Sequence, residues 1–82
     1  MAITVYSKPS CVQCTATMRA LTKYGLEFTE VNLMEDDDAL ETVKALGYQQ
    51  APVIFADGEH WAGYRPDRIK ALAAARVNSV TA

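Results

Sequence analysis

Residues 8–14 of the chain have the sequence Lys8-Pro9-Ser10-Cys11-Val12-Gln13-Cys14, and the fold is organised around them. The short segment Ile3-Thr4-Val5-Tyr6 precedes them and is typical of a β-strand. A helical periodicity follows, with Cys14, Met18 and Leu21 on one face. A Cys-x-x-Cys pair between a strand and a helix in a small chain indicates thiol redox chemistry.

The spacing of the two cysteines predicts a different role for each sulfur. We expect Cys11 in the first turn of the helix, where free N–H groups and the helix dipole favour an anion. That position raises the thiolate fraction at neutral pH, so Cys11 is the predicted nucleophile and Cys14, one turn later, the resolving thiol. Ser10 and Gln13 have the spacing of a capping box. Lys8 is a candidate for stabilising the thiolate, and a solvated surface lysine is the alternative.

The same Cys-x-x-Cys spacing also occurs in zinc sites and in structural disulfides. Zinc takes four ligands, and the chain offers two cysteines and one histidine, His60, so a metal site would need a second chain. A structural disulfide is disfavoured because the first residues lack the basic and apolar regions of a secretory signal. We therefore predict a redox-active disulfide without a metal, in the reducing cytoplasm.

The composition excludes several classes of protein. Eighty-two residues, half of them hydrophobic, fit one ordered domain spanning residues 1–82. No apolar segment approaches the ~20 residues of a membrane span. A net charge of −2 and the lack of a basic stripe argue against a nucleic-acid partner. We expect a cytoplasmic monomer that binds neither membranes nor nucleic acids.

The rest of the chain predicts three more strands and two more helices. The strands are expected at residues 28–33, 53–55 and 59–62, the helices at 37–46 and from Pro66 to Arg76, with residues 77–82 a loose tail. The acidic run before the second helix is interpreted as its N-terminal cap rather than a docking patch, and that helix should bury Ala39, Val43 and Leu46. Asp57-Gly58 predicts a hairpin.

The order of the predicted elements is β-α-β-α-β-β-α, which gives an α/β fold. The first half requires a parallel crossover, and the hairpin adds an antiparallel edge. We expect a four-stranded mixed sheet flanked by three helices. Cys11 would then lie at the carboxyl end of the first strand, where the sites of open α/β sheets gather.

Three motifs occur in order: Cys11-Val12-Gln13-Cys14, Gln50-Ala51-Pro52-Val53 and Trp61-Ala62-Gly63-Tyr64-Arg65-Pro66-Asp67. With them the chain, to about Arg76, resembles the thioredoxin superfamily in its minimal, glutaredoxin-sized form, and more narrowly the NrdH-redoxins. Thioredoxins carry Trp-Cys-Gly-Pro-Cys and dithiol glutaredoxins usually carry Pro-Tyr between the cysteines. Neither sequence is present here.

The resemblance implies a dithiol–disulfide oxidoreductase without a bound cofactor. It would donate electrons to the large subunit of class Ib ribonucleotide reductase and be reduced by NADPH and thioredoxin reductase. It also implies a cis-proline at Pro52, which faces the disulfide and presents the backbone of Ala51 to an extended substrate. Val12, Gln13, Ala51, Pro52 and Trp61 are the candidate docking residues. Helix capping for Gln13 and core packing for Trp61 are equally good interpretations.

Two other functions stay open. Glutaredoxins hold glutathione with a Gly-Gly pair and an acidic residue before their last helix. Here that place has the sequence Ala62-Gly63-Tyr64-Arg65-Pro66, and Asp67 is a candidate for the acidic residue. A glutathione-dependent glutaredoxin is therefore one alternative. A dimeric metal or iron–sulfur module that uses Cys11 across an interface is the other.

Overall fold

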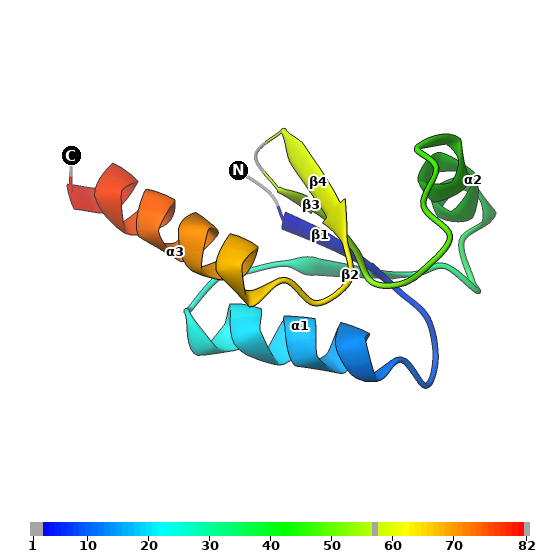
Figure 1. The fold of residues 1–82 in the computed structure, drawn as a ribbon, viewed down its shortest axis with the longest axis horizontal. Coiled ribbons are helices and arrows are strands. Elements are labelled where there is room, and N and C mark those ends of the chain that lie inside the picture. Colours follow the sequence, from blue (N-terminus) through cyan, green and yellow to red (C-terminus); the bar gives the residue numbers. More distant parts are fainter. Residues whose placement is uncertain (1–2, 57, 82) are drawn as a thin grey trace.

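The structure is a computed structural model that describes residues 3–56 and 58–81. Within these residues the chain forms β1 (Ile3–Ser7), α1 (Val12–Lys23), β2 (Thr29–Asn32), α2 (Asp37–Ala45), β3 (Val53–Ala56), β4 (Glu59–Ala62) and α3 (Pro66–Thr81). The strands make one sheet in the order β2-β1-β3-β4 (Figure 1). The predicted α/β class and order of elements are confirmed. No helix in the described ranges is both long and apolar enough to cross a membrane.

The pairing of the strands brings distant segments to one end of the sheet. β1 pairs in parallel with β2 and antiparallel with β3, while β4 pairs antiparallel with β3. Tyr6 lies opposite Val53, and Val53 lies opposite Ala62. The end of β1, the start of β3 and the end of β4 therefore lie at the same end of the sheet. The predicted hairpin is confirmed, with Gly58 at φ +85°, while Asp57 lies outside the described residues.

The core is divided between the two faces of the sheet. One buried cluster joins the sheet to α1 and α3, and its members include Val5, Leu21, Ile54 and Ile69. The other joins the sheet to α2 and contains Leu33, Ala39, Val43 and Val53. Neighbouring residues of β3 belong to different clusters, as the period of two in a strand requires. Figure 1 shows α2 at the end of the sheet opposite α3.

The start of α2 is capped as predicted. Asp36 is the N-cap residue, and its Oδ1 accepts a hydrogen bond from the Ala39 N–H at 3.0 Å. Asp37 and Asp38 occupy the first turn, where the helix dipole favours negative charge. The acidic run is thus part of the helix start.

The ends of the two later helices differ from the prediction. The sequence predicts a loose tail from Val77, yet α3 continues to Thr81, and neither Gly nor Pro follows Pro66 to stop it. Ala82 lies outside the described residues. Leu46 is the C-cap residue of α2 and is 43% exposed, so its predicted burial is wrong. The helix ends before this side chain can join the inner face.

Candidate active site

The two cysteines are joined to each other at the amino end of α1. Cys11 and Cys14 form a disulfide, with their Cα atoms 5.2 Å apart. Cys14 is 2% exposed and Cys11 is half-buried, so the two residues differ in access. Thiol–disulfide exchange requires direct attack on a sulfur. A partner from solvent can therefore approach Cys11 but not Cys14.

The sulfur of Cys11 itself caps the helix. Cys11 is the N-cap residue, with extended backbone angles (φ −100°, ψ 106°), and its Sγ accepts a hydrogen bond from the Cys14 N–H at 3.1 Å. Ser10 lies before the cap at φ +61°. The predicted capping box of Ser10 and Gln13 is therefore wrong. Cys11 was predicted in the first turn, but the helix begins one residue later, at Val12. The N–H group directed at the sulfur nevertheless favours its anionic form.

Gln13 connects the active-site helix to the turn before α3. The Tyr64 N–H donates to Gln13 Oε1 at 3.4 Å, and the Gly63 N–H donates to the Pro52 carbonyl at 2.8 Å. Gly63 has a φ of +85°, and a Cβ there would lie 3.5 Å from Gln13 Oε1. The three motifs of the sequence thus meet through their backbones and one amide side chain.

The peptide bond between Ala51 and Pro52 is cis, as the family resemblance implies. Pro52 is fully buried and Ala51 is half-buried. The strand pairing places both residues at the edge of the sheet where β1 leads into the cysteine motif. The backbone of Ala51 remains the candidate surface for an extended substrate.

The other predicted site residues divide into exposed and buried ones. Val12 is 83% exposed between the cysteines, and Lys8 is exposed and lines the same groove as Cys11. Trp61 is 4% exposed and belongs to the core shared with α1 and α3. Its burial contradicts the predicted docking role and supports the packing alternative, because a buried indole offers a partner no surface.

A groove beside the disulfide contains a polar pair that the sequence analysis misses. The groove has a volume of about 440 Å³, and its walls include Ser7, Cys14 and Glu30. Ser7 is 3% exposed and donates its hydroxyl to Glu30 Oε2 at 2.8 Å. The alternation of Ile3, Val5 and Ser7 along β1 is the signal that places Ser7 on the buried face.

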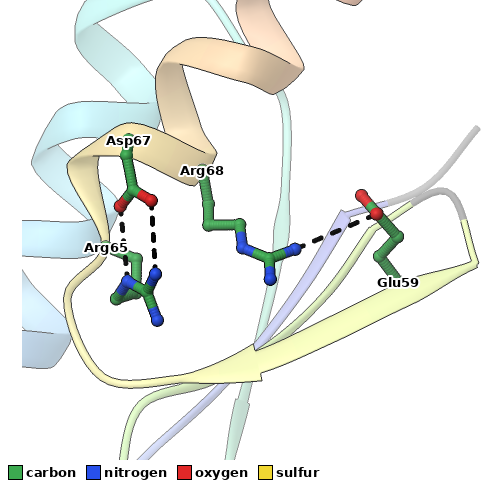
Figure 2. A network of polar contacts seen from close by, with 4 residues as sticks. All are labelled: Glu59, Arg65, Asp67 and Arg68. Carbon is green, nitrogen blue, oxygen red and sulfur yellow. Dashed lines mark hydrogen bonds and ion pairs between the residues drawn. The ribbon is translucent and has the colours of Figure 1, made fainter.

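Ion pairs fix the turn before α3 and attach that helix to β4 (Figure 2). Arg65 donates from Nε to Asp67 Oδ1 at 3.3 Å and from Nη2 to Oδ2 at 3.2 Å. These hydrogen bonds lower the pKa of the Asp67 carboxyl below its usual value. Arg68 pairs with Glu59 at 3.9 Å, and its guanidinium lies 5.6 Å from the centre of the Trp61 ring.

The histidine considered as a metal ligand is engaged elsewhere. His60 Nδ1 lies 2.6 Å from the Tyr48 hydroxyl, and the His60 ring stacks on Phe55 at 5.3 Å. In the part of the chain that the structure describes, no group of three His, Cys, Asp or Glu residues is placed to hold a metal ion.

Comparison with known proteins places the chain in a family. The glutaredoxin family model matches residues 3–61. The glutaredoxin-like protein NrdH of Salmonella typhimurium is 46% identical over 72 residues, which cover 88% of this chain and 89% of that protein. The chain belongs to the NrdH-redoxin family.

Similarity to two further proteins supports the assignment of this redoxin to the family. The NrdH protein of Lactococcus lactis subsp. cremoris is 37% identical over 71 residues, covering 87% of this chain and 99% of that protein. The solved structure of the glutaredoxin-like NrdH-redoxin of Escherichia coli matches with a TM-score of 0.85 and 42% identity. It covers 88% of this chain and 95% of that one.

The redoxin is a thiol–disulfide oxidoreductase. Its family and its Cys11–Cys14 disulfide together establish this chemistry. The dithiol form passes two electrons and two protons to a substrate disulfide, and the disulfide of the structure is what remains on the redoxin.

Proposed function

We propose that the redoxin is a cytoplasmic monomer that carries electrons from NADPH-dependent thioredoxin reductase to the large subunit of class Ib ribonucleotide reductase. The resemblance to the NrdH-redoxins implies both partners. The similar protein of Escherichia coli, a glutaredoxin-like NrdH-redoxin, is described as having a thioredoxin-like activity profile. In this chain, one observation carries the choice of reductant, namely the pairing of Arg65 with Asp67.

The turn before α3 offers few free groups to glutathione. Glutathione carries two carboxylates and an amino group, and a charge left unpaired on binding is costly. The carboxylate of Asp67 already accepts two hydrogen bonds from Arg65, so neither charge is free. The Tyr64 N–H already donates to Gln13, and Pro66 has no N–H to offer. Glutathione would have to displace these contacts, whereas a protein reductase needs none of them.

The proposed cycle assigns one step to each cysteine. The Cys11 thiolate attacks a substrate disulfide, forming a mixed disulfide and releasing the first substrate thiol. Cys14 then attacks the Cys11 sulfur, which releases the second thiol and restores the Cys11–Cys14 disulfide. The half-exposed Cys11 and the 2% exposed Cys14 suit this order. Val12, 83% exposed, gives a large partner an apolar contact beside the nucleophile.

The electron source is tested by NADPH consumption with one protein disulfide as the common substrate. We expect thioredoxin reductase to support turnover several-fold faster than glutathione with glutathione reductase at the same redox poise. The single variant Asp67→Ala, which frees the Arg65 guanidinium for a glutathione carboxylate, should narrow this difference by raising the glutathione rate. Lys70→Ala, which removes an exposed charge from the same helix, is the matched control. Equal rates for the two sources would replace the proposal with an ordinary glutaredoxin.

The electron acceptor is tested with purified class Ib ribonucleotide reductase. Catalytic amounts of the redoxin, with NADPH and thioredoxin reductase, should support repeated formation of deoxyribonucleotide. The Cys14→Ser variant should stop after the first attack. Failure of the parent redoxin with an active reductase would remove this partner and leave the oxidoreductase activity in place.

A further inference from the structure

Cys14 must lose a proton before it can resolve the mixed disulfide, and it lies away from solvent. The residue is 2% exposed, so water has little access to its sulfur. Apolar burial favours the neutral thiol, while only the thiolate attacks a disulfide. The resolving step therefore benefits from a base held by the protein.

The groove beside the disulfide holds such a base. Among the described residues that line it, Glu30 is the one carboxylate and Lys8 the one cation. Buried Ser7 lines the groove with Cys14 and donates its hydroxyl to Glu30 at 2.8 Å. Glu30 itself is exposed, so it exchanges protons with water. Ser7 and Glu30 together connect the buried wall of the groove to solvent.

The sheet fixes the position of this pair. Within the parallel pair β1 and β2, Val5 lies opposite Glu30 and Ser7 lies opposite Asn32. Paired residues and residues two apart share a face of the sheet. Ser7 and Glu30 therefore lie on the same face as the buried Val5, the face that α1 and α3 cover. The pair depends on strand pairing and not on the cysteine motif.

We propose that Ser7 and Glu30 form a proton relay that deprotonates Cys14 during the resolving step. The proposal rests on the function proposed above, in which Cys11 is the nucleophile. The Cys14 thiol passes its proton to Ser7 Oγ while the Ser7 hydroxyl proton moves to the Glu30 carboxylate. The Cys14 sulfur then bonds to the Cys11 sulfur, and the bond from Cys11 to the substrate sulfur breaks. The substrate leaves as a thiolate with the electron pair, and Glu30 returns the proton to water.

The two steps of the reaction can be followed separately in one rapid-mixing experiment. The reduced redoxin is mixed with excess chromogenic aromatic disulfide, which releases one coloured thiol on attack and a second on resolution. For Glu30→Gln we expect an unchanged first phase and a second phase slowed on the order of a hundredfold near pH 7, a typical effect for general base catalysis. Glu27→Gln removes an exposed carboxylate just before β2 and should retain both parental rates.

The pH dependence separates a relay from a structural role. In the parent, the second phase should change little between about pH 6 and 8, because the relay and not the thiolate fraction of Cys14 then supplies the deprotonation. In Glu30→Gln it should rise about tenfold per pH unit, since it then follows the small thiolate fraction of Cys14. Ser7→Ala should behave like Glu30→Gln, and Ser7→Thr, which keeps a hydroxyl, should restore the flat profile.

The possible failures point to different conclusions. Equal second phases in the parent and in Glu30→Gln at every pH would overturn the relay. A mixed disulfide found on Cys14 instead of Cys11 would overturn the proposed order of attack. Because Glu30 is exposed, its substitution decides the question even if Ser7→Ala does not fold.

Discussion

At the amino end of α1, one cysteine is accessible from solvent and the other belongs to the core. We therefore expect Cys11→Ser to lose disulfide reduction completely, because the buried Cys14 cannot meet a substrate. Cys14→Ser should retain the first attack and accumulate a mixed disulfide on Cys11. Mass spectrometry after exposure to a disulfide substrate measures both outcomes. Adducts on Cys14 in the Cys11→Ser protein would reverse the roles.

The ionisation of the Asp67 carboxyl determines the pH range over which the Arg65–Asp67 pair can disfavour glutathione. Hydrogen bonds from Arg65 lower its pKa, so the contribution of the pair is present above the unfolded value of about 3.9 and is lost as pH falls through the lower folded value. The pair is thus intact between about pH 6 and 8. We expect the ratio of the glutathione rate of Asp67→Ala to that of the parent, both measured at the same pH, to stay constant there. A ratio that changes with acidification would show that another group controls the discrimination.

The chemistry of individual residues was the most predictable part of the site. The cysteine pair and the cis-proline follow from motifs, because each needs a residue type that few others can replace. The cap was not predictable from spacing, since Ser10 and Cys11 are both polar enough to cap, and the structure gives the N-cap position to Cys11, whose sulfur accepts the Cys14 N–H. The partner of Ser7 was hidden as well, because Glu30 comes 23 residues later and meets it only through strand pairing.

At the scale of elements, a comparison of two glycine positions distinguishes the effect of backbone strain alone from the effect of strain beside the active site. Gly63 (φ +85°) and Gly47 (φ +88°) are both in the left-handed region, but only a Cβ at Gly63 would meet Gln13. Both alanine variants should lose roughly 1–2 kcal/mol of stability in urea unfolding. Only Gly63→Ala should also slow reduction by thioredoxin reductase, because its backbone strain falls in the turn whose Tyr64 N–H donates to Gln13. Equal activity in the two variants would show that the Gln13 contact has no role in catalysis.

The start of α2 gives a second test at this scale. Asp36→Ala removes the side chain that accepts the Ala39 N–H and should cost about 1 kcal/mol of unfolding free energy. Asp37→Ala removes an exposed charge from the first turn without removing that cap, so it should cost clearly less, about 0.3 kcal/mol. Urea unfolding at matched pH compares them. An equal loss in both would assign the effect to charge alone.

Helices and strands were predictable where several local signals agree. A helix end was hard to predict where no Gly or Pro terminates the helix. The strands, the hairpin and the start of α3 at Pro66 follow from alternation, a glycine turn and a proline at the first helical position. The end of α3 does not, since composition alone does not show where a helix without a terminating Gly or Pro ends. Leu46 was misplaced because periodicity extends one residue past the cap.

At the scale of the whole molecule, the sheet keeps packing and chemistry apart. The two buried clusters lie on its two faces, while the disulfide lies at the end of the sheet where the three motifs meet. A tryptophan inside one of those motifs looks like a functional residue in the sequence. The fold instead turns its side chain into the cluster with α1 and α3 and covers it with Arg68. Residues of a single motif can thus serve different purposes, some in the core and others at the active site.

This division predicts opposite effects for Trp61 and Val12. Trp61→Ala should cost about 3–5 kcal/mol of unfolding free energy, as large aromatic truncations in cores do. Trp61→Phe should cost less, and in the described residues the indole N–H has no acceptor to lose. The KM of the Trp61→Phe variant with thioredoxin reductase should match that of the parent. Val12→Ser changes an 83% exposed side chain, so stability should stay within about 0.5 kcal/mol while the KM rises.

Unfolding in urea and steady-state kinetics with thioredoxin reductase, measured on the same preparations, compare the two positions directly. Trp61→Phe retains most of the buried ring, so it folds well enough for its KM to be read without interference from instability. A raised KM in Trp61→Phe with parental stability would mean that the indole reaches the partner despite its 4% exposure. An unchanged KM in Val12→Ser would remove the apolar contact beside the nucleophile, and the partner would then have to recognise the backbone around Ala51 and the turn at Gly63.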